Sequence, residues 1–311
     1  FFASTTIGYP HQCPSTRMSA THSSTPLPPF THCSQLHEAC AQWAQIALTD
    51  LKPRRKLDLS DKKADFQEAL SALKRFAKSS GYKAPQKLKV HAALENAWLW
   101  QAAAQQACQL LIYGIDLGLT PAVLRPIFME TAALWRDTAQ VFQHAQQAMS
   151  KESGEPYGVP AAIVTSSSEY KYAVQLLSLA VLLDAQEEIS HLVEHVLAFD
   201  TDRLLDYLCA GVLELEEASE TLYHRRPYGQ LLPFFEQLGE AQPDLLRPYL
   251  QSEYEDFMLL SPKQQKKAGP WLGTGYWALE VAALSVLYDW DDTLLRESPN
   301  YPADLVDCVR Q

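Results

Sequence analysis

The sequence predicts an all-α protein, a multi-helix bundle without significant sheet. Apolar residues recur three and four positions apart along most of the chain after residue 33, which is the spacing of one helix face. No segment shows the sustained strict alternation that is typical of a half-buried strand. Glycine is also scarce, with 12 among 311 residues, whereas all-β chains usually need more turn glycines.

Three segments are expected along the chain. Residues 1–31 are rich in Ser, Thr and Pro without periodicity and are predicted to be disordered, with Met18 as the natural start. Residues 32–150 are predicted to form an N-terminal helical region, and residues 168–311 a C-terminal helical domain. The stretch between them has the composition of a loop, with Gly154, Pro156, Gly158, Pro160 and a run of serines.

The first helical region should contain at least three amphipathic helices. A stripe from Phe66 to Ala77 marks the first of them. The second is predicted from about residue 88 to 113, ending at Gly114, and its content of Ala, Trp and Gln suggests close contact between helices. The third covers residues 121–149.

The second half shows three more apolar stripes at helical spacing. They lie within residues 173–183, 189–197 and 205–215. Prolines are tolerated only in a first helical turn, so they should divide the following chain into shorter helices at Pro227, Pro243 and Pro248. A last long helix is predicted over residues 274–288.

The net charge of −11 makes the chain a poor nucleic-acid binder, because that binding rests on lysine and arginine neutralising phosphates. Residues 51–90 hold twelve basic against four acidic residues, whereas residues 182–260 hold seventeen acidic against four basic. Solvated helix faces explain such runs, but a basic protein partner also fits. Neither a membrane-length apolar run nor a secretory signal is visible, so a soluble cytoplasmic protein without membrane partner is expected.

The six cysteines show neither a C-x-x-C pair nor the spacing of a disulfide framework. They are expected to be scattered thiols in a reducing compartment. The segment from Val286 to Leu294 resembles the first motif of haloacid-dehalogenase-type phosphatases, D-x-D-x-T after a strand. Only 17 residues follow it and the residues before it have helical spacing, so a helix end followed by an Asp-capped turn is expected instead.

His191, Glu194 and His195 match the H-x-x-E-H pattern of inverted zinc peptidases. Two histidines one helical turn apart could bind zinc, and the glutamate could act as the base for a zinc-bound water. These three residues point away from the apolar stripe of their own helix. A third zinc ligand is not evident nearby, so a solvated helix face is the simpler interpretation, and a zinc-dependent hydrolase stays as the alternative function.

The C-terminal stretch resembles the C-terminal domain of PoNi-type immunity proteins. The resemblance lies in Gly275–Ala283, Asp291-Asp292 and Tyr301–Val306, with looser similarity at Tyr170–Leu183 and Asp202–Leu208. It implies a helical inhibitor of a PoNe-type nuclease toxin associated with type VI secretion. Residues 33–150 do not match the usual N-terminal domain of that family, and only Trp271 precedes the Tyr-Trp motif where the family has more tryptophans.

The motif residues themselves are interpreted as structural. Glu280 falls within the apolar arc of its helix, so it should be buried and should need an arginine or a tyrosine hydroxyl as partner. Asp291 and Asp292 should cap a turn, and Tyr301-Pro302 should fix the entry to the last helix.

The sequence therefore predicts an immunity protein that neutralises a cognate toxin by binding it, without catalysis, cofactor or bound metal. A scaffold or adaptor with another partner is a third interpretation. The docking surface is expected on the acidic second half, where a helix around residues 202–220 and a following aromatic-containing cluster group carboxylates. The toxin-binding residues so predicted are Asp202, Asp206, Glu216, Glu217, Glu220, Glu253, Tyr254, Glu255 and Asp256.

Overall fold

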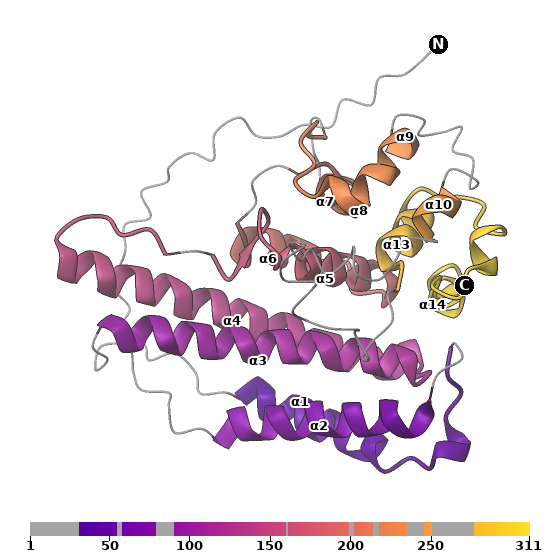
Figure 1. The fold of residues 1–311 in the computed structure, drawn as a ribbon, viewed down its shortest axis with the longest axis horizontal. Coiled ribbons are helices and arrows are strands. Elements are labelled where there is room, and N and C mark those ends of the chain that lie inside the picture. Colours follow the sequence, from indigo (N-terminus) through magenta and orange to yellow (C-terminus); the bar gives the residue numbers. More distant parts are fainter. Residues whose placement is uncertain are drawn as a thin grey trace.

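The N-terminal half is a group of long helices. The structure, a computed structural model, describes residues 31–54, 58–78, 90–159, 161–198, 202–213, 218–235, 246–250 and 277–311. The helices of this half are α1 (Thr31–Ala44), α2 (Leu59–Lys78), α3 (Val90–Asp116) and α4 (Pro121–Ser153), with a 3-10 turn, η1 (Leu48–Asp50). Helices α3 and α4 run side by side, and α1 and α2 cover one flank of that pair (Figure 1).

Close packing of α3 on α4 follows from the composition of α3. Ala103, Ala104 and Ala107 are fully buried, and their small side chains let the two helices approach each other. Trp100 and Trp135, both fully buried, fill the remaining space. The alanine-rich pattern therefore marks a helix–helix contact, as the sequence suggested.

Helix α3 does not end at Gly114 as predicted but continues to Asp116. The residue that ends it is Gly118, whose φ of +83° lies in the left-handed region that favours glycine. A Cβ atom at Gly118 would lie 1.8 Å from the carbonyl oxygen of Lys52, so this position also needs glycine for space. The close approach brings the segment around Lys52 against the end of α3.

Arg54, two residues after Lys52, contacts both halves of the chain. Its guanidinium donates to the carbonyl oxygens of Ile115 (2.8 Å) and Leu119 (2.7 Å) at the end of α3. Its Nε lies 2.7 Å from Oδ1 of Asp304, in the last helix of the protein. Only 8% of the Arg54 side chain is exposed, so the contact is a buried cap as well as an ion pair.

The C-terminal half is built from shorter helices that pack around the apolar helix over residues 170–182. The elements that its described residues form are α5 (Tyr170–Leu182), α6 (Glu187–His195), α7 (Arg203–Cys209), α8 (Arg225–Tyr228), η3 (Gly229–Leu231), α9 (Leu232–Phe235), α10 (Arg247–Leu250), α13 (Leu279–Leu287), η5 (Leu295–Glu297) and α14 (Ala303–Val309). Helix α5 contacts α3 and α4 as well as α7, α13 and α14. Buried residues of both halves consequently form one continuous hydrophobic core.

Two two-residue strands are the β-structure that the described residues contain. Strands β1 (Ile163–Val164) and β2 (Leu197–Ala198) pair in parallel, with Ile163 opposite Leu197. The pair fastens the loop before α5 to the end of α6. The prediction of an all-α fold without significant sheet is thus confirmed.

Several expected boundaries change. The stripe predicted over residues 205–215 forms α7, which ends at Cys209, and residues 214–217 lie outside the described part of the chain. The last long helix begins at Leu279, and residues 274–276 are also outside. Of the predicted disordered segment 1–31, only Thr31 is described, and it begins α1.

The described cysteines are all unpaired. Among the described residues, Cys33, Cys40, Cys108 and Cys209 are buried and Cys308 is exposed, and all five are free thiols. Burial raises the pKa of Cys33 and of Cys40 to about 12, which leaves these thiols protonated and unreactive. None of the described helices is long and apolar enough to cross a membrane.

Candidate interaction site

Asp202, one of the predicted toxin-binding residues, is fully buried and serves the fold. It is the N-cap of α7, where its Oδ1 accepts hydrogen bonds from the backbone N–H groups of Leu204 (3.1 Å) and Leu205 (3.2 Å). The same oxygen accepts from the hydroxyl of Tyr170 (2.6 Å), and Oδ2 accepts from the backbone N–H of Tyr223 (3.0 Å). The carboxylate therefore joins three segments of the C-terminal half.

Asp206 is also fully buried, and its Oδ2 accepts a hydrogen bond of 2.7 Å from the backbone N–H of Ser219. The expectation that Asp202 and Asp206 lie on an exposed acidic helix face is wrong, because both carboxylates are used to satisfy backbone and tyrosine donors inside the protein. The expected helix over residues 202–220 is also too long, since α7 ends at Cys209.

The other predicted docking residues divide into two groups. Glu220 is described and exposed, after the end of α7. The remaining members lie outside the described residues, namely Glu216, Glu217, Glu253, Tyr254, Glu255 and Asp256. Of the expected acidic face, only Glu220 is therefore observed at the surface.

The motif residues near the C-terminus make structural contacts, although Asp292 pairs with Arg296, Arg310 and Tyr301 and does not cap a turn as predicted. Glu280 is buried, and its Oε1 accepts a hydrogen bond of 2.7 Å from the Tyr249 hydroxyl. Oδ1 of Asp291 accepts from the backbone N–H of Thr293 (3.0 Å), which caps the turn after α13. Tyr301, just before α14, donates to Oδ2 of the buried Asp292 (2.8 Å).

The H-x-x-E-H residues occupy the exposed face and C-terminal end of α6. His191, Glu194 and His195 are all exposed, and the two imidazole rings stack with centroids 6.1 Å apart. The described residues contain no group of three or more His, Cys, Asp or Glu side chains that could hold a metal ion. The zinc-hydrolase alternative thus gains no support from this motif.

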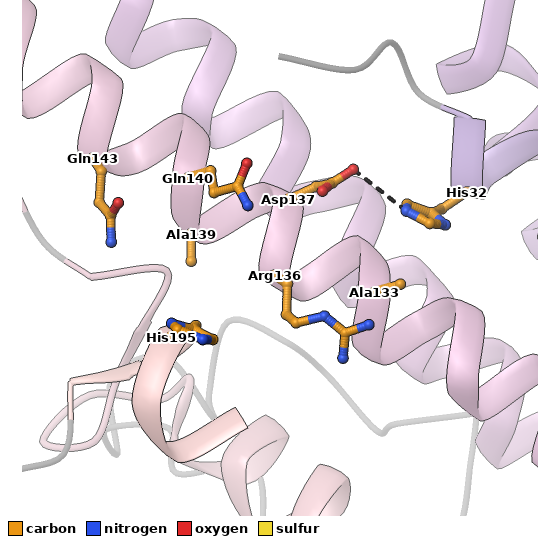
Figure 2. A pocket seen from close by; sticks show the side chains of 8 residues that line it. All are labelled: His32, Ala133, Arg136, Asp137, Ala139, Gln140, Gln143 and His195. Carbon is orange, nitrogen blue, oxygen red and sulfur yellow. Dashed lines mark ion pairs between the residues drawn. The ribbon is translucent and has the colours of Figure 1, made fainter. Parts of the chain in front are cut away.

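His195 instead lines a cavity between α1, α4 and α6, with a volume of about 350 Å³. Figure 2 shows His32 reaching it from α1, His195 from the end of α6, and polar side chains of α4 between them. Its full lining is His32, Ala133, Arg136, Asp137, Ala139, Gln140, Gln143 and His195. The cavity therefore combines side chains from both halves of the chain.

Ion pairs surround this cavity. His32 Nδ1 lies 2.6 Å from Oε2 of Glu130, and its Nε2 lies 3.4 Å from Oδ2 of Asp137. Both ring nitrogens of His32 therefore face carboxylate oxygens. Arg136 pairs with the buried Glu188 of α6. Burial raises the pKa of Asp137, although the charges of His32 and Arg136 oppose that effect.

Sequence reasoning found one member of this cavity, His195, and assigned it to a different motif. The other members with ionisable side chains are His32, Arg136 and Asp137. The sequence of α4 does indicate a polar face beside its apolar stripe, because Arg136, Gln140 and Gln143 follow one another at helical spacing. That pattern does not reveal which helices face it, so the cavity became evident only in the folded chain.

Comparisons with known proteins place the chain in a class. Residues 30–153 match the family described as PA2201 N-terminal domain-like. Residues 200–305 match the C-terminal domain of PoNe immunity proteins (PoNi). The chain is thus a helical protein whose residues 200–305 are similar to the PoNi C-terminal domain, as the sequence resemblance suggested.

A solved structure specifies the relationship further. The crystal structure of protein PA2201 from Pseudomonas aeruginosa has 47% sequence identity and a TM-score of 0.76, and the alignment covers 92% of this chain and 99% of that one. At this identity and coverage, the chain belongs to the PA2201 family. A comparison with curated proteins gives no match.

Proposed function

We propose that this protein is an immunity protein that binds and neutralises a cognate antibacterial toxin without catalysing a reaction. The observation that carries the proposal is the match of residues 200–305 to the C-terminal domain of PoNe immunity proteins. The similarity to the PA2201 crystal structure covers 92% of this chain and concerns the fold and the family. We further propose, as the resemblance to PoNi-type immunity proteins implies, that the toxin is a nuclease delivered by type VI secretion and met in the cytoplasm.

The buried carboxylates of the C-terminal half support a binding role over a catalytic one. Asp202, Glu280 and Asp292 accept hydrogen bonds from neighbouring tyrosines, so they serve packing. A rigid scaffold is what an inhibitor needs to hold a complementary surface, because preorganisation lowers the entropy lost on binding.

We propose the acidic second half as the docking surface, now without Asp202 and Asp206. Its candidates are Glu216, Glu217, Glu220, Glu253, Tyr254, Glu255 and Asp256. The charge balance of residues 182–260 would attract a basic toxin, and exposed charges of this kind mainly raise the association rate.

The test is co-purification with the product of the neighbouring gene, followed by protection of cells that express that product. Wild-type protein should bind and protect. Reversing Glu216, Glu217 and Glu220 together to Lys should slow association and flatten its salt dependence, with the fold intact. A matched control is Glu152→Lys, an exposed residue at the end of α4.

Two results would contradict the proposals separately. Failure of the wild-type protein to bind or protect contradicts the immunity function. Wild-type-like protection and salt dependence in the triple variant contradict only the acidic docking surface.

A further inference from the structure

Asp137, which lines the cavity between α1, α4 and α6, has a buried acceptor oxygen that lacks a donor. Oδ2 of Asp137 is buried and receives no hydrogen bond, since His32 Nε2 at 3.4 Å makes an ion pair without hydrogen-bond geometry. Buried carboxylate oxygens are normally satisfied, and an unsatisfied one costs stability. The raised pKa of Asp137, caused first by burial, agrees with this shortage of donors.

We propose that this cavity receives a lysine or arginine side chain of the partner toxin, which binds the carboxylate of Asp137. The proposal rests on the immunity function proposed above and adds a specific anchor to it. A guanidinium or ammonium group supplies N–H donors only, and these are what Asp137 lacks.

The charges around the cavity suit a cationic occupant. Arg136 is already paired with the buried Glu188, so its charge is compensated. His32 lies between Glu130 and Asp137, which leaves an excess of carboxylates on the α1 side. His195, on the α6 side, has the Glu194 carboxylate 3.6 Å away.

Size and polarity also fit an extended basic side chain. The volume of about 350 Å³ lies at the lower end of ligand-binding cavities, which suits one long side chain better than a cofactor. Ala133 and Ala139 provide small apolar walls for the methylene groups, and the carboxamide oxygens of Gln140 and Gln143 can accept further hydrogen bonds. The occupant would contact both halves of the chain at once.

A fragment titration tests the cavity without the toxin. n-Butylguanidinium is added to the full chain, and the histidine ring resonances are followed by NMR, with sodium butyrate as the anionic control. We expect saturable shifts of the His195 and His32 resonances with butylguanidinium and none with butyrate. Preferential binding of butyrate, or no saturable shift with either compound, overturns the proposal.

Variants distinguish the contribution of the Asp137 carboxylate to binding from the contribution of the cavity volume. Asp137→Asn keeps the cavity and should weaken butylguanidinium binding at least about tenfold. Ala133→Leu keeps the carboxylate but fills the cavity, and it should weaken binding to a similar extent. Glu130→Gln is the matched control, because it contacts the same His32 but does not line the cavity, and it should change the affinity less than about threefold. Unchanged affinity in folded Asp137→Asn overturns the proposal.

The same variants are then assayed against the toxin encoded by the neighbouring gene. Asp137→Asn should increase the rate of toxin release, because a buried charge pair mainly controls dissociation. If wild type and Asp137→Asn bind the toxin equally well, the cavity proposal fails while the immunity function stands. If wild type binds no toxin, the immunity function fails, and the fragment titration reports on the cavity independently.

Discussion

The two halves of the molecule bury carboxylates to very different degrees. Among the described residues, helices α1–α4 bury one acidic residue completely, Asp116 at the end of α3, whose partner at 2.8 Å is Trp277 Nε1 of the other half, and they also bury one carboxylate oxygen of Asp137. The C-terminal half buries several more, namely Glu188, Asp202, Asp206, Glu280 and Asp292.

Helix length accounts for two of these carboxylates, Asp202 and Asp206, because both accept backbone N–H groups. Helix α4 has 33 residues and satisfies most of its backbone groups internally, whereas α7 has seven. Each helix leaves about four N–H and four C=O groups without partners, whatever its length. A half built from short helices therefore needs side-chain acceptors such as Asp202, and a half built from long helices can rely on apolar stripes.

The largest predicted effect lies in the core of the N-terminal half. Phe128 of α4 is fully buried, so Phe128→Ala should lower the free energy of unfolding by about 3–5 kcal/mol through lost burial and a cavity. Urea unfolding measures this loss, with Phe128→Leu as a control that keeps most of the apolar volume. A loss below about 1 kcal/mol would show that the long-helix half does not depend on its apolar core.

Asp202→Asn tests the C-terminal half with almost no change of volume. It should cost about 2–4 kcal/mol, because an amide nitrogen replaces one acceptor oxygen and leaves Tyr170 or a backbone N–H unsatisfied. Tyr170→Phe removes a single hydrogen bond and should cost less. Equal stability of Asp202→Asn and wild type would remove the main distinction between the two halves.

Glu280→Ala should cost about 1–3 kcal/mol, because it leaves the buried Tyr249 hydroxyl without its acceptor. The thermal midpoint reports the loss. Tyr249→Phe combined with Glu280→Ala should be less destabilising than the sum of the two single changes, since the pair is lost only once. Strict additivity would mean that the two residues do not depend on each other.

The smallest effect concerns acid pH and Asp292. Burial alone would raise the pKa of Asp292, but hydrogen bonds from Arg296 and Tyr301 outweigh it and hold the pKa below its ordinary value. The ionised carboxylate therefore adds stability above the unfolded-state pKa of about 4, and this stability is lost as the pH falls through the lower folded-state pKa.

Comparison of urea unfolding from pH 7 down to about pH 2 checks this dependence. Stability should fall more steeply with acid in wild type than in Asp292→Asn, which cannot titrate at that position. Parallel curves for the two proteins would contradict a stabilising role for the ionised form.

The sequence predicted the fold class and most helix positions, because an apolar stripe is a local pattern that each helix carries by itself. It also predicted burial of Glu280, from its place within such a stripe. It misplaced Asp202, because a carboxylate before a leucine-rich helix can be either an exposed charge or a buried cap, and the decision depends on Tyr170 and Tyr223. The cavity was not predictable, since His32, Asp137 and His195 meet only after three helices pack together.

The contact of Arg54 with Asp304 forms late during synthesis of the chain. The two residues are 250 positions apart, so the ion pair cannot form until almost the whole chain has been synthesised. At about 5–20 residues per second, the N-terminal helices leave the ribosome roughly 12–50 seconds before α14 does. During that interval α3 and α5 lack their contacts with the C-terminal segment. In a chain released before residue 304, Arg54 would have no carboxylate from the last helix to pair with.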